Sequence, residues 1–155
     1  MQGSLNHIGL SGEGLNLKDI HYTHNDSDEG LKWVLDAEEV KFSGDKNSIF
    51  FQDFLLKLEL RDSQWLKLKG KQGNYFRASG DINLLGNLEG FSGNGYKIET
   101  EHILINEKTG LLSTKKPVKI FGPFFSVAGK GLFADLEKKK LKILSDVTTI
   151  FNKGF

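Results

Sequence analysis

The stretch WVLDA at residues 33–37 is a short alternating segment that ends on a small residue, and the chain repeats this pattern three more times. The later copies are LKLKG at 66–70, YKIET at 96–100 and FSVAG at 125–129. In each copy alternate side chains differ in character, as they do in a strand with one buried and one solvent-exposed face. The four copies therefore predict a chain that is built from repeated strands.

The step between the copies is nearly constant. The small residues that end them are 33, 30 and 29 residues apart: Ala37, Gly70, Thr100 and Gly129. A second set of apolar landmarks keeps a similar step of 34, 30 and 29 residues: Phe54, Leu88, Val118 and Val147. Repeats of this length that contain strands and no helix form extended structures in which each repeat packs on its neighbours. We therefore expect the functional surface to be the continuous inner face of such a structure.

The apolar phase shifts by one position after each small residue. Leu35 and Ala37 are followed by Val40 and Phe42, and the same shift follows residues 98–100. A shift beside a residue with little or no side chain predicts a β-bulge or a corner that bends the strand. Bent strands that stack in register form a curled sheet, so the predicted fold class is all-β, with about four strand–turn–strand repeats.

The domain organisation that we expect is simple. Residues 1–14 carry four glycines and little periodicity, which predicts a flexible lead-in, and residues 1–4 resemble the remnant of an expression tag. Residues 15–155 are expected to form a single β-roll domain. The segment 135–144 is predicted to be a hairpin, with a helical turn as the alternative.

Composition excludes several classes of function. Lys and Arg number 21 against 20 Asp and Glu, so no strong field attracts nucleic acid. The chain contains no cysteine, which excludes disulfides and thiolate metal sites. The lysines cluster near the C-terminus, where they are interpreted either as a solvated turn or as a docking site for acidic groups: Lys138, Lys139, Lys140 and Lys142.

No set of residues predicts catalysis, a metal site or a cofactor. His21 and His24 are three residues apart but flank a predicted strand and turn, and neither His7 nor His102 has a partner at ligand spacing, so ordinary polar roles are favoured over metal binding. Gly-x-Gly pairs such as Gly93 and Gly95 lack the third glycine and the lysine of a phosphate loop. Carboxylate pairs such as Glu99 and Glu101 lie in alternating strands, where exposed charges are expected. We therefore expect a protein that is not an enzyme and that needs no cofactor.

Several motifs together resemble the LptC family, over roughly residues 17–151. They are Trp33-x-x-x-Ala37, Leu84-x-Gly86-x-Leu88, Thr100 in the third repeat, and the segment PVKIFG at 117–122 followed by GKGL at 129–132. The resemblance implies an open-ended, twisted antiparallel β-roll of the jelly-roll type, also described as OstA-like. It also implies a periplasmic subunit of the ABC transporter that exports lipopolysaccharide.

The resemblance further implies a route for the cargo. The domain would accept lipopolysaccharide from the membrane subunits of the transporter and pass it to a soluble periplasmic bridge protein, while a separate cytoplasmic subunit hydrolyses ATP. Family members are anchored to the inner membrane by an N-terminal helix, which this sequence lacks, so we expect a truncated chain. The alternatives are a soluble bridge-type relative and a β-roll scaffold that carries no lipid.

The resemblance also implies that inward-facing apolar residues bind acyl chains. The apolar phase of each repeat predicts which residues these are: Trp33, Leu35, Val40, Phe42, Phe54, Leu68, Leu84, Leu88, Ile98, Ile103, Ile105, Val118, Ile120 and Val127. The terminal position of the last strand predicts that it forms the edge that binds the bridge protein, through Leu141, Ile143, Val147 and Ile150.

Overall fold

The computed structural model describes residues 8–11, 14–24, 31–60 and 64–151. Ten strands account for most of them, and no helix occurs in the described ranges. The strands are β1 (Ile8–Ser11), β2 (Gly14–His24), β3 (Lys32–Phe42), β4 (Ser48–Glu59), β5 (Trp65–Phe76), β6 (Asp81–Ser92), β7 (Lys97–Asn106), β8 (Leu111–Phe121), β9 (Phe125–Asp135) and β10 (Lys140–Phe151).

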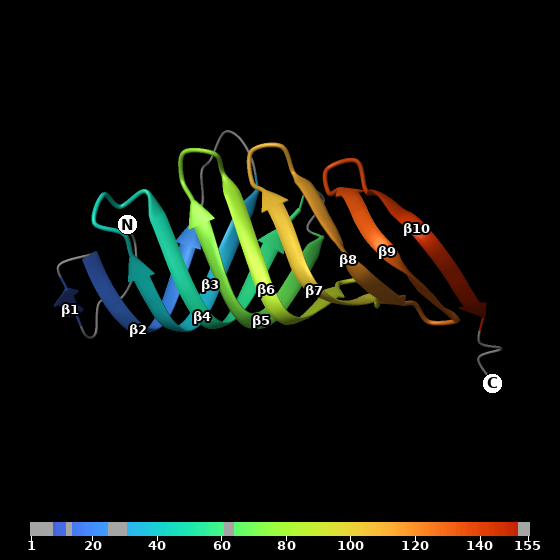
Figure 1. Ribbon diagram of the computed structural model, residues 1–155, viewed down its shortest axis with the longest axis horizontal. Coiled ribbons are helices and arrows are strands. Elements are labelled where there is room, and N and C mark those ends of the chain that lie inside the picture. Colours follow the sequence, from blue (N-terminus) through green and yellow to red (C-terminus); the bar gives the residue numbers. More distant parts are fainter. Residues whose placement is uncertain (1–7, 12–13, 25–30, 61–63, 152–155) are drawn as a thin grey trace.

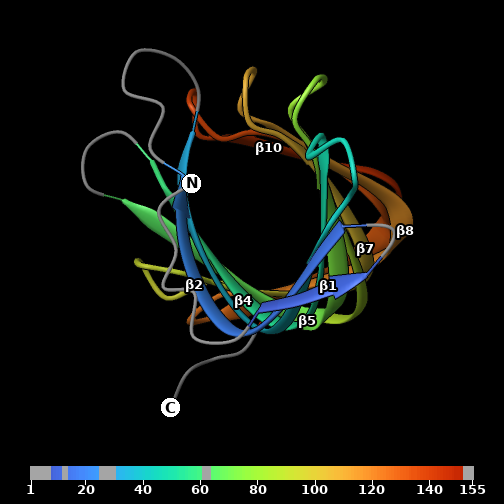
Figure 2. The same cartoon turned by 90° about the vertical axis from the view of Figure 1, so that its left-hand side faces the viewer.

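The strands form one antiparallel sheet in which each strand pairs with the next along the chain. Figure 1 shows them side by side along the long axis of the molecule, and Figure 2 shows the sheet curling around a common interior. The sheet stays open, with β1 at one edge and β10 at the other. This arrangement confirms the predicted all-β, open-ended antiparallel roll. The hairpin predicted at 135–144 is also present, as β9, a four-residue turn and β10.

The start of the chain differs from the expected lead-in. Ile8–Ser11 form β1, which pairs with β2 through partners such as Ile8 and Leu17. Gly14, the last residue of the expected lead-in, begins β2. Main-chain pairing with a neighbouring edge needs no alternation of apolar residues, so the sequence pattern gave no sign of this strand.

Most strands bend near their middle, and the bends are marked in the backbone. Asp19, Asp53, Asn87 and Asp146 have φ values of 53°, 49°, 48° and 54°. Asp and Asn tolerate this left-handed region better than most residues. Register shifts lie at the same level in five of the ladders, from β5–β6 to β9–β10. The predicted bends are therefore confirmed, and they turn a flat meander into a roll.

Small and large side chains alternate along the inside of the bend. The pairing places Ala37 opposite Phe54 and Phe54 opposite Gly70, and the row continues through Leu88, Thr100, Val118 and Gly129. A Cβ atom added to Gly70 would lie 2.3 Å from Cδ2 of Leu88 and 3.0 Å from Cζ of Phe54. The repeat therefore ends on a small residue because a large neighbour on the adjacent strand fills that space.

We expect Gly70→Val to lower the free energy of unfolding by about 1–3 kcal/mol, because the new side chain overlaps Leu88 and Phe54. Urea denaturation of the two proteins measures this difference. The control is Lys69→Val on the exposed face of the same strand, for which we expect a change within about 0.5 kcal/mol. Equal effects of the two substitutions would contradict the packing explanation of the repeat.

Candidate functional site

The interior of the roll has a packed part and an open part. In the packed part, side chains from β2 to β8 fill the space between the curled strands, and residues such as Trp33, Leu35 and Leu84 are at most 2% exposed. The open part is a groove of about 640 Å³ toward the β10 end, lined mainly by apolar side chains. The inner surface of the sheet is therefore covered by packed side chains in one part and borders an open groove in the other.

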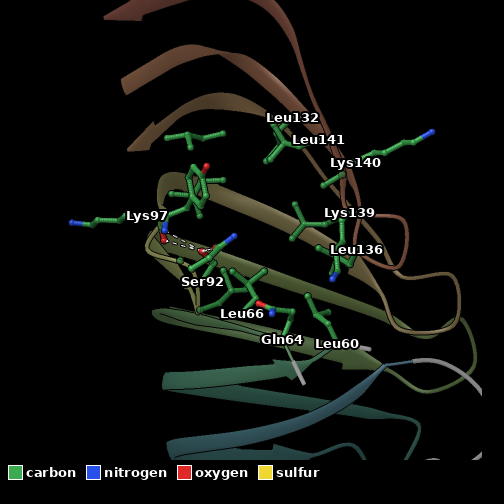
Figure 3. A pocket seen from close by; sticks show the side chains of 18 of the residues that line it. Leu60, Gln64, Leu66, Ser92, Lys97, Leu132, Leu136, Lys139, Lys140 and Leu141 are labelled. Atoms are coloured by element: carbon green, nitrogen blue, oxygen red, sulfur yellow. Dashed lines mark hydrogen bonds between the residues drawn. The ribbon is translucent and has the colours of Figure 1, made fainter. Parts of the chain in front are cut away.

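The groove lies between two rims of the curled sheet. One rim carries Leu60 and Gln64, from the connection between β4 and β5, and the other carries Leu136, Lys139 and Leu141, from the β9–β10 hairpin. Figure 3 shows these rims facing each other, with apolar side chains from the intervening strands between them. The floor includes side chains of β5, β7, β8 and β9. An elongated apolar ligand would therefore contact several strands at once.

The predicted lipid-binding residues divide between the two parts. Five of them line the groove: Leu68, Ile98, Ile103, Ile120 and Val127. The other nine lie outside the groove lining, in the packed core, where none is more than 6% exposed: Trp33, Leu35, Val40, Phe42, Phe54, Leu84, Leu88, Ile105 and Val118. Alternation predicts an inward-facing side chain in either case, so it does not separate a groove lining from a core.

Several groove residues were missed by the sequence analysis. Leu60 and Leu66 continue the alternation of their strands, and Leu132 follows the second glycine of the GKGL segment. The apolar phase of these strands was a sufficient signal for all three. Phe125 shares the phase of Val127 in the FSVAG copy and could have been found in the same way, whereas Leu136 lies in a turn, where the period of two ends, and offered no comparable signal.

A buried carboxylate holds the packed part of the roll closed. Glu107, in the β7–β8 turn, is 6% exposed and accepts a hydrogen bond of 3.1 Å from Nε1 of Trp33. His24 Nε2 lies 2.9 Å from the same carboxylate, and the Tyr75 hydroxyl donates to its second oxygen. The main-chain N–H of Leu31 donates to the Glu107 carbonyl at 2.8 Å. The β7–β8 turn is thereby tied to β2, β3 and β5, from which it is distant in sequence.

Aromatic rings surround this carboxylate. The rings of His24 and Trp33 stack with centroids 4.9 Å apart, and Tyr75 contacts both rings edge-on. Burial alone would raise the pKa of the Glu107 carboxyl, but the hydrogen bonds from His24, Tyr75 and Trp33 together outweigh it and hold this pKa below its usual value. Burial and the bond to Glu107 raise the pKa of Tyr75. Glu107 and its three partners therefore form a cluster in which a buried carboxylate accepts hydrogen bonds from neutral or cationic side chains.

The predicted partner-binding residues lie on β10, the last strand of the sheet, whose outer edge pairs with none of the other described strands. Val147 and Ile150 are 55% and 57% exposed. Leu141 and Ile143 line the groove instead, at the hairpin end of the strand. The last strand thus combines part of the groove with an exposed apolar edge.

No other feature of the described residues indicates chemistry. His21 pairs with Asp36 at 2.6 Å on the surface, and His102 bonds Asn83 at 3.0 Å. Within the described ranges no three potential metal ligands lie together. The same ranges contain no helix that is long and apolar enough to cross a membrane.

Comparison with protein families aligns residues 14–152 with the family described as "Lipopolysaccharide-assembly, LptC-related". The chain belongs to the LptC family. LptC proteins are periplasmic, non-enzymatic components of lipopolysaccharide transport. Comparison with curated proteins finds no match. The groove and the exposed β10 edge are therefore features of an LptC-family roll.

We expect Glu107→Gln to lower the free energy of unfolding at pH 7 by about 2–4 kcal/mol, because three donors lose a charged acceptor. The effect depends on pH. Since the pKa of Glu107 is lowered by folding, its contribution is complete above the usual value of 4.5 and disappears as the pH falls through the folded value. Urea denaturation between pH 7 and pH 3 should show the two proteins converging in acid.

The control for this substitution is Asp36→Asn, which removes an exposed carboxylate that also pairs with a histidine. Exposed pairs contribute about 0–1 kcal/mol, so this variant should stay close to the parent protein at every pH. A constant difference between the parent and Glu107→Gln from pH 7 to pH 3 would contradict the assigned role of the carboxylate.

Proposed function

We propose that this chain accepts lipopolysaccharide from the membrane subunits of an ABC transporter and passes it to a soluble periplasmic bridge protein. In this proposal the acyl chains occupy the groove, and the full-length protein is anchored to the inner membrane. The observation that carries the proposal is the apolar groove of about 640 Å³ in an LptC-family roll. The domain itself performs no catalysis and requires no cofactor, metal or nucleic acid.

The groove has suitable physical properties for acyl chains. Its volume lies in the range of roughly 300–1,000 Å³ that is typical of ligand sites. Apolar burial contributes about 25 cal/mol per Å² without requiring a fixed orientation, so chains of different length can bind. Ile98 and Val127 on the groove wall are only half-buried, which leaves apolar surface for a ligand to cover.

The β10 edge supports the proposed transfer to a bridge protein. An unpaired edge strand presents main-chain N–H and C=O groups that a strand of another protein can extend. The exposed apolar side chains of Val147 and Ile150 lie on this strand. A bridge protein that added its strand here would continue the sheet and bring its own interior next to the groove.

A β-roll scaffold without lipid cargo is the second candidate. The packed part of the roll favours it, because the protein's own side chains fill that interior and leave nine predicted lipid-binding residues covered. A soluble bridge-type relative would share the same groove and edge. Lipid binding in the groove distinguishes a carrier from a scaffold, since a carrier should hold lipid there and a scaffold should not.

We expect a photoreactive residue at Ile98, such as p-benzoylphenylalanine, to crosslink to purified lipopolysaccharide, because this position lies in the groove. The same residue at Ile105, in the packed core, and at Lys119, on the exposed face, should give no crosslink. Circular dichroism checks that each variant is folded. Absence of a crosslink from a folded Ile98 variant would favour the scaffold.

We expect Val147→Arg to weaken binding of the bridge protein by roughly tenfold, because it places a charge in an apolar edge contact. Surface plasmon resonance with the immobilised bridge protein measures this change. Phe50→Arg, which alters a residue 44% exposed on the outer face of β4, is the matched control and should leave binding unchanged. Unchanged binding by Val147→Arg would place the contact elsewhere.

A further inference from the structure

We infer that Leu66 and Leu136 keep one stretch of the roll open between its two rims, and that the acyl chains of the cargo enter the groove through this stretch. This inference rests on the proposed function. It adds the route by which the lipid enters, and it assigns two groove residues to keeping that route open.

The seam of the roll, the line along which its two rims face each other, is latched in one repeat. There Nε1 of Trp33 donates to the Glu107 carboxylate at 3.1 Å, and the main-chain N–H of Leu31 donates to the Glu107 carbonyl at 2.8 Å. His24 and Tyr75 bind the same carboxylate. These contacts across the seam, which we call the Glu107 latch, lie over the packed part of the interior.

The β9–β10 turn repeats the geometry of the β7–β8 turn that carries Glu107. In both turns the side-chain oxygen of the first residue accepts the main-chain N–H groups two and three residues later, at 3.0 Å for Asn106 and 3.1 Å for Asp135. The main-chain N–H groups of Glu107 and Leu136 each donate to a glycine carbonyl in the preceding turn of the same rim, at 2.8 Å and 2.9 Å. Leu136 therefore occupies the position that Glu107 occupies one repeat earlier.

The partners of Glu107 on the opposite rim also have counterparts one repeat later. Leu66 begins the second copy of the repeat, LKLKG, as Trp33 begins the first, WVLDA. His24 is paired with Trp33 across the β2–β3 ladder. Leu58 is paired with Leu66 in the same way across the β4–β5 ladder. Leu58 and Leu66 therefore stand where His24 and Trp33 stand in the latched repeat.

The second repeat replaces the polar latch with aliphatic side chains. Tyr75 is the penultimate residue of β5, and its counterpart Ile105 is the penultimate residue of β7. The counterparts of the four side chains of the latch are thus Leu58, Leu66, Ile105 and Leu136. Aliphatic side chains neither donate nor accept hydrogen bonds, so they cannot form a latch of this kind.

The groove lies where the Glu107 latch has no counterpart. Leu66 on β5 and Leu136 in the β9–β10 turn both line it, and both are half-buried (Figure 3). In the described part of the chain no main-chain hydrogen bond joins Leu136 to Gln64, which corresponds to Leu31. The same sheet is therefore latched over its packed interior and open over its groove.

The seam is the access to the groove that the fold leaves open. Toward β1 the interior is filled by side chains such as Trp33 and Leu84, at most 2% exposed, so an acyl chain cannot slide in lengthwise from that end. Toward β10 lies the edge that we propose for the bridge protein. Exposed polar side chains such as Gln64 and Asn94 border the groove above its apolar floor, as is typical of a ligand site that opens to water.

The first test grafts a latch into the second repeat. The variants are Leu66→Trp, Leu136→Glu and the double variant Leu66→Trp/Leu136→Glu. Isothermal titration calorimetry with purified lipopolysaccharide measures binding, and urea denaturation measures stability. We expect the double variant to bind about tenfold more weakly than the parent. It should nevertheless unfold at a higher urea concentration than Leu136→Glu, because the Trp N–H supplies a donor to the new carboxylate.

The two measurements together distinguish a closed seam from a damaged groove. Substitutions that only damage the groove would lower binding and stability together, with no recovery of stability in the double variant. That result would contradict the assigned role of Leu66 and Leu136. Recovered stability with binding equal to that of the parent would contradict it as well.

The second test closes the seam while Leu66 and Leu136 stay in place. The chain contains no cysteine, so Gln64→Cys/Glu137→Cys introduces two thiols at exposed positions, one on each rim, which a short bismaleimide can join. The reference is the same variant with both thiols capped by N-ethylmaleimide. The matched control is Lys32→Cys/Lys108→Cys, two exposed positions beside the Glu107 latch, tethered in the same way.

Stopped-flow fluorescence of Trp65, which lines the groove, follows the entry of lipopolysaccharide. We expect the groove tether to slow entry about tenfold relative to the capped protein, and the control tether to leave the rate unchanged. Equal rates for the tethered and capped proteins would overturn the inference and leave the proposed function intact. Equal slowing by both tethers would also overturn it, since the effect would not depend on the open stretch. If the parent protein binds no lipopolysaccharide, the proposed function itself is wrong.

Discussion

The structure depends on the space available at the inside of each bend. A strand can turn inward only if its concave face is not overfilled, and here large side chains such as Phe54 and Leu88 face small ones such as Gly70 along one row. This alternation lets most of the strands bend at the same level, so that the sheet curls instead of remaining flat. The interior and the groove both result from that curl.

The curled sheet then divides its interior by how its rims meet. Around Glu107 the rims are joined by hydrogen bonds to Trp33, Tyr75 and His24, and the interior beneath them is packed. Farther along, the rims at Gln64 and Lys139 border the groove. One continuous apolar surface therefore supplies both a packed core and an open groove.

Local patterns account for what the sequence predicted correctly. Strands, turns and bends follow from alternation and from small residues such as Ala37, because these features depend on residues close in the chain. Glu107 was missed because it lies in a turn of polar residues and gains its partners only when distant strands meet. The division between core and groove was also missed, since the apolar pattern predicts that Ile98 and Ile105 both face inward, and they differ only in what lies opposite.

The strict neighbour-to-neighbour order of the strands has a consequence for how the chain reaches this structure. A meander can form hairpin by hairpin, since each ladder needs only two adjacent segments. The bond between Trp33 and Glu107 instead spans 74 residues, so it requires β3 and the β7–β8 turn to be in place together. Closure is thus a late step that must wait for most of the strands, and until then the apolar surface of a newly made chain remains exposed to solvent and to other chains.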